Sequence, residues 1–74
     1  MTLVKTVSIE ERFGMRIREL RKRQKISQEE LAFRCHLSKN YVSDVERGTR
    51  NITLKVVEKF AYGLNVSLAE LFSF

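Results

Sequence analysis

The sequence predicts an all-α domain of five helices without β-strands, and three observations predict it. The 74 residues contain no proline and only three glycines, so little in the chain would interrupt a helix. Serine or threonine caps recur at short intervals, and the apolar residues after each cap follow helical spacing. We expect one domain over residues 1–74, which buries only about 60% of its unfolded surface and would gain stability from dimerisation.

The first predicted helix runs from the Ser8 cap to about Gln24, and Glu11 completes a capping box. Between Arg12 and Lys25 seven basic residues stand against one acid, a net charge of +6 in a chain whose total is +5. Such a concentration attracts polyanions, although a solvated helix face without a partner explains charge alone equally well. The stripe expected to be buried is Ile9, Phe13, Ile17 and Leu20.

Two short helices then meet across a tight turn between Gln28 and Arg47. Ser27 caps the first of them, with Glu30 closing a capping box, and Ser38 caps the second. About three residues remain for the bend, so the two helices must cross sharply, and we expect a left-handed backbone at His36 within it. The expected hydrophobic staples are Ile26 with Leu31 and Leu37 with Val42.

Two further helices are expected after Gly48, which is a natural helix stop. The fourth begins after Thr53 and ends at Gly63. The fifth opens at Ser67 with Glu70 as a capping box and finishes within a few residues. The apolar set of the fourth helix is Leu54, Val57, Phe60 and Ala61.

The last residues of the sequence are unusually apolar for an exposed terminus. They either fold back on the core or bury themselves against a second subunit, and we favour a mixture with some of them in a two-fold interface. The candidates for this interface are Leu68, Leu71, Phe72 and Phe74.

The third predicted helix turns Val42 and Val45 inward and leaves a polar outer face suited to a DNA major groove. Arginine and lysine can donate to guanine, asparagine can bond adenine, and serine is permissive. Asp44 would be repelled by phosphates, and it would either orient a neighbouring arginine or accept a hydrogen bond from a cytosine amine. The candidate base-reading residues are Lys39, Asn40, Ser43, Arg47 and, beyond the helix, Arg50.

Candidate phosphate contacts flank this face. Gln28 stands at the start of its helix, where free backbone N–H groups and the helix dipole favour an anion, although an ordinary polar first residue is as good an interpretation. Tyr41, Thr49 and Asn51 could hold the backbone on the other side, and the Tyr41 ring is expected to pack partly in the core.

Other kinds of function find little support. The composition, 43% hydrophobic and 31% charged, is typical of a folded globular protein, and no segment has the apolar length of a membrane span or the core of a signal peptide. A single Cys35 and a single His36 give too few ligands for zinc and little acid-base chemistry, so we expect no enzyme activity, metal, cofactor or small-molecule substrate.

The motif as a whole resembles the Cro/C1-type helix-turn-helix of phage repressors, and NITLKVVEKFAYGLNVSLAELF resembles the closing two helices of that family. This sequence departs from the family pattern at His36, where most relatives have glycine, and at Asn51, near a position where many relatives have proline. The resemblance implies a five-helix lambda-repressor-like DNA-binding domain. The residues at the defining positions are Gln28, Leu31, Ala32, Leu37, Val42 and Val45.

The short length and the segment LSKNYVSDVERGTRN further resemble the controller proteins of restriction-modification systems. This resemblance implies a cytoplasmic homodimer, bacterial or phage-encoded, that binds palindromic operators, activates transcription, and represses it at higher concentration. It also implies that Glu29 and Glu30 touch RNA polymerase, at its sigma subunit, although compensation of the helix dipole explains them equally well. The alternatives are a phage-type repressor and an antitoxin-like protein-interaction module.

Overall fold

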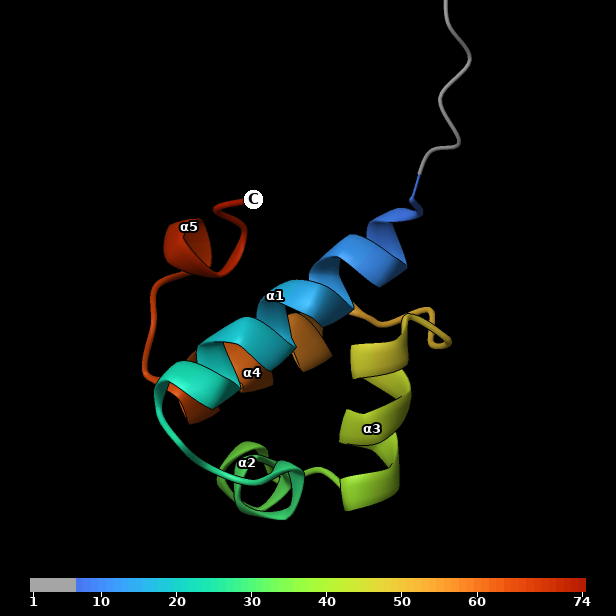
Figure 1. The fold of residues 1–74 in the computed structure, drawn as a ribbon. Coiled ribbons are helices and arrows are strands. Elements are labelled where there is room, and N and C mark those ends of the chain that lie inside the picture. The colour runs from blue at the N-terminus through green and yellow to red at the C-terminus, as the bar shows by residue number, and fades with distance from the viewer. Residues whose placement is uncertain (1–6) are drawn as a thin grey trace, which may run out of the picture.

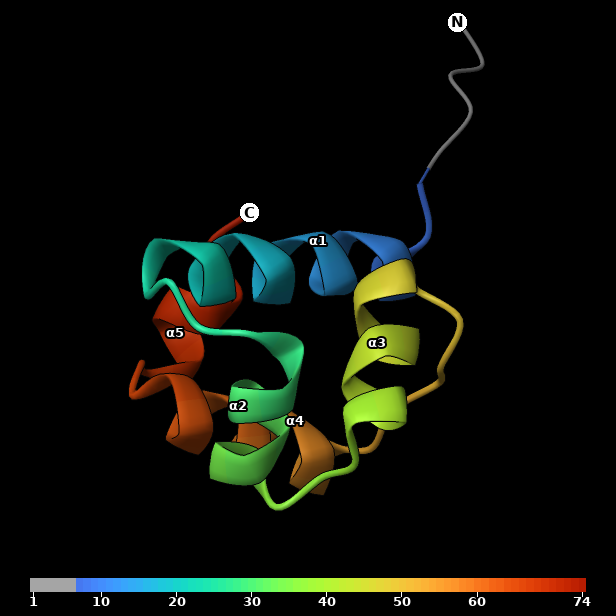
Figure 2. The same cartoon turned by 60° about the horizontal axis from the view of Figure 1, so that its bottom comes forward.

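The computed structural model describes residues 7–74, and this part of the chain forms five α-helices and no strand, as predicted. In Figure 1, α1 lies in front of α4, and α3 and α5 lie on opposite sides of α1. Figure 2 shows the same arrangement from below, with α2 beside α3. The prediction about a signal peptide falls partly on residues 1–6, outside the described residues. The helices are α1 (Ile9–Arg23), α2 (Gln28–Cys35), α3 (Lys39–Arg47), α4 (Leu54–Leu64) and α5 (Leu68–Leu71).

Every helix begins at its predicted cap, whose side-chain oxygen accepts a hydrogen bond from the backbone N–H three residues later. A complete capping box forms only at Ser8 and Glu11. The boxes predicted at Glu30 and Glu70 are wrong, because only the cap-to-backbone half of each is present. The Glu30 carboxylate instead accepts from Nε of Arg34, one turn further along α2, at 3.0 Å.

Helices α2, α3 and α4 each end at a left-handed residue. His36 has φ 58° and ψ 42°, as predicted, and Gly48 takes the same role after α3. The stop predicted at Gly63 is wrong, because α4 continues to Leu64 and Asn65 makes the left-handed turn. In each turn the next residue donates its N–H to the carbonyl five residues earlier, as from Leu37 to Ala32 at 2.9 Å.

Two glycines lie inside helices because backbones approach each other closely there. A Cβ on Gly63 would stand 2.3 Å from Sγ of Cys35, where α4 contacts α2. A Cβ on Gly14 would stand 2.2 Å from the carbonyl oxygen of Val45, where α1 contacts α3. These two glycines therefore set how closely the helix-turn-helix pair packs on α1 and α4.

The core is formed from all five helices, and the predicted stripes hold except at two helix starts. Ile9 is 54% exposed and Leu54 is 85% exposed, so neither belongs to the core. Each is the first residue of its helix. The staple residues Ile26 and Leu37 pack against the core from outside, and Ile52 and Val66, which precede the caps of α4 and α5, do the same. The core residues are Phe13, Ile17, Leu20, Leu31, Ala32, Cys35, Val42, Val45, Val57, Phe60, Ala61, Leu64 and Leu71.

The C-terminal segment folds back on α1. Nε and Nη2 of Arg16 donate to the carbonyl oxygen of Glu70 at 3.2 and 2.7 Å, and the ring of Phe72 lies 5.4 Å from that of Phe13. Leu71 is fully buried, so the prediction that it contacts a second subunit is wrong: its side chain fills the core of its own chain. The other three candidates, Leu68, Phe72 and Phe74, are exposed.

The close contact of Gly14 with α3 decides whether a substitution at Gly14 raises or lowers the free energy of unfolding. Gly14→Ala should lower the free energy of unfolding by about 1–3 kcal/mol, because the new methyl group meets the backbone carbonyl of Val45. Urea denaturation measures this, and Met15→Ala at an exposed neighbour is the control. A gain of stability, as Gly→Ala gives in an uncrowded helix, would show that α1 and α3 are further apart.

Candidate nucleic-acid interface

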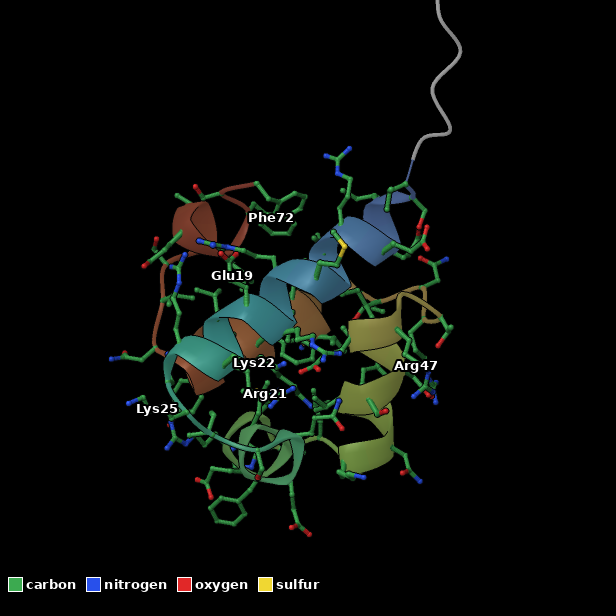
Figure 3. The ribbon with its side chains drawn as sticks, viewed as in Figure 1. Glu19, Arg21, Lys22, Lys25, Arg47 and Phe72 are labelled. Carbon is green, nitrogen blue, oxygen red and sulfur yellow. The ribbon has the colours of Figure 1, made fainter. Side chains whose placement is uncertain are left out.

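The outer face of α3 is polar and its inner face is apolar, as predicted. Val42 and Val45 are buried, whereas Lys39, Asn40 and Arg47 are exposed. Figure 3 shows Arg47 on the outer side of α3, pointing away from α1 and α4. The helix that carries this face has 9 residues, and it begins at the Ser38 cap and ends at the left-handed Gly48.

Asp44 joins two of the predicted base-reading residues. Its carboxylate accepts hydrogen bonds from Nη2 of Arg47 and, at 3.2 Å, from Nε of Arg50. Nη1 of Arg47 also donates to Oγ of Ser43 at 2.6 Å. Asp44 is therefore hydrogen-bonded to two arginines within the protein itself.

Tyr41, in the first turn of α3, and Thr49, just after the helix, support this cluster. The Arg50 guanidinium lies over the Tyr41 ring, 4.7 Å from its centroid, and the half-buried Tyr41 packs against the core as expected. Thr49 donates from both N–H and Oγ1 to the carbonyl oxygen of Asp44, at 3.0 and 3.1 Å. Asn51 is exposed in the connection to α4.

Gln28, the first residue of α2, belongs to a hydrogen-bond network with α1 and α3 that the sequence interpretation missed. Glu46 is buried and accepts two hydrogen bonds from Arg21 of α1, at 2.7 and 3.0 Å, and one from Nε2 of Gln28 at 3.0 Å. Nη1 of Arg21 also donates to the carbonyl oxygen of Ile26 at 3.0 Å. The hydrogen bond to Glu46 raises the pKa of Arg21 above its ordinary value. The signal was available, because Glu46 follows Val42 by four residues and so shares its inward face.

The basic residues of α1, together with Lys25 in the turn after it, divide into structural and exposed groups. Arg21 and Arg16 are engaged internally, and Arg23 pairs with Glu19 at 3.0 Å. The hydrogen bond from Arg16 lowers the pKa of Glu19 below its usual value. In Figure 3, Lys25 lies on the side of the molecule away from α3. Part of the positive charge between Arg12 and Lys25 is therefore used in hydrogen bonds and ion pairs within the protein. The exposed basic residues without a role in these pairs are Arg12, Arg18, Lys22 and Lys25.

Cys35 has the properties of a core residue. Its side chain is fully buried, and burial raises the pKa of the thiol to about 11, so the thiol stays protonated at neutral pH. Within residues 7–74 no group of three His, Cys, Asp or Glu side chains could hold a metal ion, and no helix is long and apolar enough to cross a membrane.

The buried ion pair should dominate the stability of this site. Glu46→Ala should cost about 3 kcal/mol of the free energy of unfolding, because it leaves the Arg21 guanidinium buried without its carboxylate. Glu30→Ala, which breaks the exposed pair with Arg34, should cost about 1 kcal/mol or less. Urea denaturation compares the two variants, and equal losses would mean that the Arg21 to Glu46 pair is no more important than a surface pair.

Comparison with known proteins agrees with this geometry. A family model described as helix-turn-helix matches residues 17–71. The chain is 44% identical over 63 residues to the control protein C.BamHI of Bacillus amyloliquefaciens, covering 84% of this chain and 78% of that protein. It is 43% identical over 63 residues to the control protein C.MunI of a Mycoplasma species, covering 84% and 85%.

A solved structure gives the same result. The restriction-modification controller protein C.AhdI of Aeromonas hydrophila superposes with a TM-score of 0.82 at 46% identity, covering 85% of this chain and 96% of that one. The chain therefore belongs to the helix-turn-helix family of DNA-binding transcription regulators, in the group of the restriction-modification controller proteins.

Proposed function

We propose that this chain controls transcription of restriction-modification genes by binding a palindromic operator as a homodimer, activating first and repressing at higher concentration. The observation that carries the proposal is the polar outer face of α3, on which Lys39, Asn40 and Arg47 are exposed and Ser43 is partly exposed, with Arg50 exposed just beyond the helix. A regulator of this kind acts where the DNA is, which in a bacterium is the cytoplasm.

In this proposal α3 lies in the major groove and these five side chains meet base edges. Lys39 and Asn40 stand in the first turn of α3, and the first turn of a recognition helix commonly contacts bases. Arg47 and Arg50 carry the donors that guanine O6 and N7 accept. Ser43 and Asp44 hold the side chain of Arg47 at the last turn of α3.

The proposed phosphate contacts border the reading face. Gln28 is the first residue of α2, and its hydrogen bond to Glu46 ties it to α3, so a phosphate bound there would fix the register of the recognition helix. Thr49 and Asn51 lie in the exposed connection after α3. Tyr41 is partly buried against the core, and the Arg50 guanidinium lies over its ring.

The proposed dimer interface is an apolar surface formed by α5 and the start of α4. A shallow surface depression there is lined by Leu54, Val57, Leu68 and Phe72 together with Lys55 and Glu58. Leu54, which we had placed in the core, is 85% exposed and joins Leu68 and Phe72 on this surface. Phe74 packs against Phe72 and Arg12, so we place it at the edge of the interface. A two-fold axis here would set two copies of α3 about 34 Å apart on DNA.

Activation requires a contact with RNA polymerase, for which we propose the start of α2. Glu29 is exposed there, whereas the neighbouring Glu30 carboxylate is paired with Arg34. Glu29 is therefore the better candidate of the two for a contact with the sigma subunit. Both acids also compensate the positive end of the α2 dipole.

Selection of bound sequences from a random DNA pool tests the DNA-binding proposal, and a symmetric pair of half-sites is expected. On the selected site, Arg47→Ala should weaken binding by about 1–3 kcal/mol and relax the preference at one base pair of each half-site. Gln28→Ala should weaken binding to all sequences alike, because a phosphate carries no sequence information. A pool that yields no preferred sequence would refute the proposal.

Sedimentation tests the dimer. Leu68→Ala should raise the dissociation constant of the dimer at least about tenfold, because burial of a leucine in the interface contributes roughly 1.5 kcal/mol or more. Phe33→Ala is the matched control, since Phe33 is 78% exposed on α2, away from this surface. A wild-type chain that stays monomeric at all concentrations would instead favour a foreign partner for the apolar surface.

A further inference from the structure

A single carboxylate stands between the two arginines of the reading face. Asp44 Oδ1 accepts from Nη2 of Arg47, and Oδ2 accepts from Nε of Arg50 at 3.2 Å. Arg47 comes from the last turn of α3 and Arg50 from the connection that follows, so Asp44 couples a helix residue to a loop residue. Its side chain is 26% exposed, against 60% for Arg47 and 48% for Arg50.

The atoms used in these bonds leave the two arginines in different states. Asp44 engages Arg50 through Nε, so the outer edge of that guanidinium, formed by its two Nη atoms, stays available for a bidentate contact with guanine. The Tyr41 ring supports the same guanidinium at 4.7 Å. Arg47 has both Nη atoms engaged, one by Ser43 and one by Asp44. Arg50 is thus pre-oriented for reading, whereas Arg47 is restrained.

The charge of Asp44 works against DNA binding as such. A carboxylate on a surface that faces phosphates repels them, so it lowers affinity for every sequence. Any contribution of Asp44 to recognition must then come from how it places the arginines. A guanidinium that is fixed before binding loses less conformational entropy when it meets its base.

Resting on the proposed DNA-binding function, we propose that Asp44 is a specificity-determining positioning residue, whose carboxylate holds Arg50 in the orientation that reads guanine and restrains Arg47 until DNA is bound. Asp44 contributes to the choice of sequence without touching a base. The two arginines therefore act as one unit through this residue.

Equilibrium titrations of selected operator DNA and of scrambled DNA test this. Asp44→Asn, which keeps the shape and removes the charge, should reduce the ratio of operator to scrambled affinity by about tenfold, the size of one well-made guanine contact. Its affinity for scrambled DNA should rise or stay unchanged. Glu19→Gln removes the same charge from a carboxylate that also pairs with two arginines, but on α1, and it should leave the ratio unchanged. Thermal melting followed by circular dichroism checks that both variants are folded.

A double-mutant cycle identifies the route of the effect. In the Arg50→Ala background, Asp44→Asn should have little further effect at the base pair that Arg50 reads, because no guanidinium remains there to orient. Equal effects in both backgrounds, or an unchanged specificity ratio in Asp44→Asn, would overturn the inference and leave Asp44 as a repulsive charge only. Loss confined to a C·G pair and independent of Arg50 would overturn it in favour of direct reading of cytosine. A wild-type chain without any sequence preference would refute the proposed function itself.

Discussion

The buried ion pair between Arg21 and Glu46 is the contact on which the DNA-reading part of this fold depends. It joins α1 to the inner side of α3, and Gln28 and the carbonyl oxygen of Ile26 bring the start of α2 into the same network. Glu46 is followed directly by Arg47, so the residue that anchors α3 and a residue that faces DNA are adjacent in the chain. A charged pair removed from water holds its geometry tightly because either partner alone would be costly to bury.

Close backbone packing supports this arrangement from both sides. Gly14 lets α1 approach the carbonyls of Val45 and Glu46, and Gly63 lets α4 approach Cys35 at the end of α2. The helix-turn-helix pair is therefore held between two longer helices rather than by its own turn alone. A chain of 74 residues has a small core, so each of these close contacts matters more for stability than it would in a larger domain with more buried contacts.

Positive charge in this protein has two separate uses. Arg16 fastens the C-terminal segment to α1 through the carbonyl of Glu70, and Arg21 fastens α3. Arg47 and Arg50 instead remain on the surface, held by a neighbouring carboxylate. The net charge of +5 thus overstates what is free to meet phosphates, and the distribution of the charges matters more for recognition than their sum.

The sequence by itself determined the five helices, their caps, the left-handed turn at His36 and the polar face of α3, because these depend on local hydrogen bonds and helical spacing. Only the tertiary structure decided which arginines serve the fold, that Leu71 lies in the core while Leu54 is exposed, and that Asp44 joins two arginines. Arg16 and Glu70 are far apart in the chain, as are Arg21 and Glu46, and spacing within one helix says nothing about a partner on another. Local patterns thus specify elements, whereas the pairing of buried charges and the exposure of helix ends follow from how those elements pack.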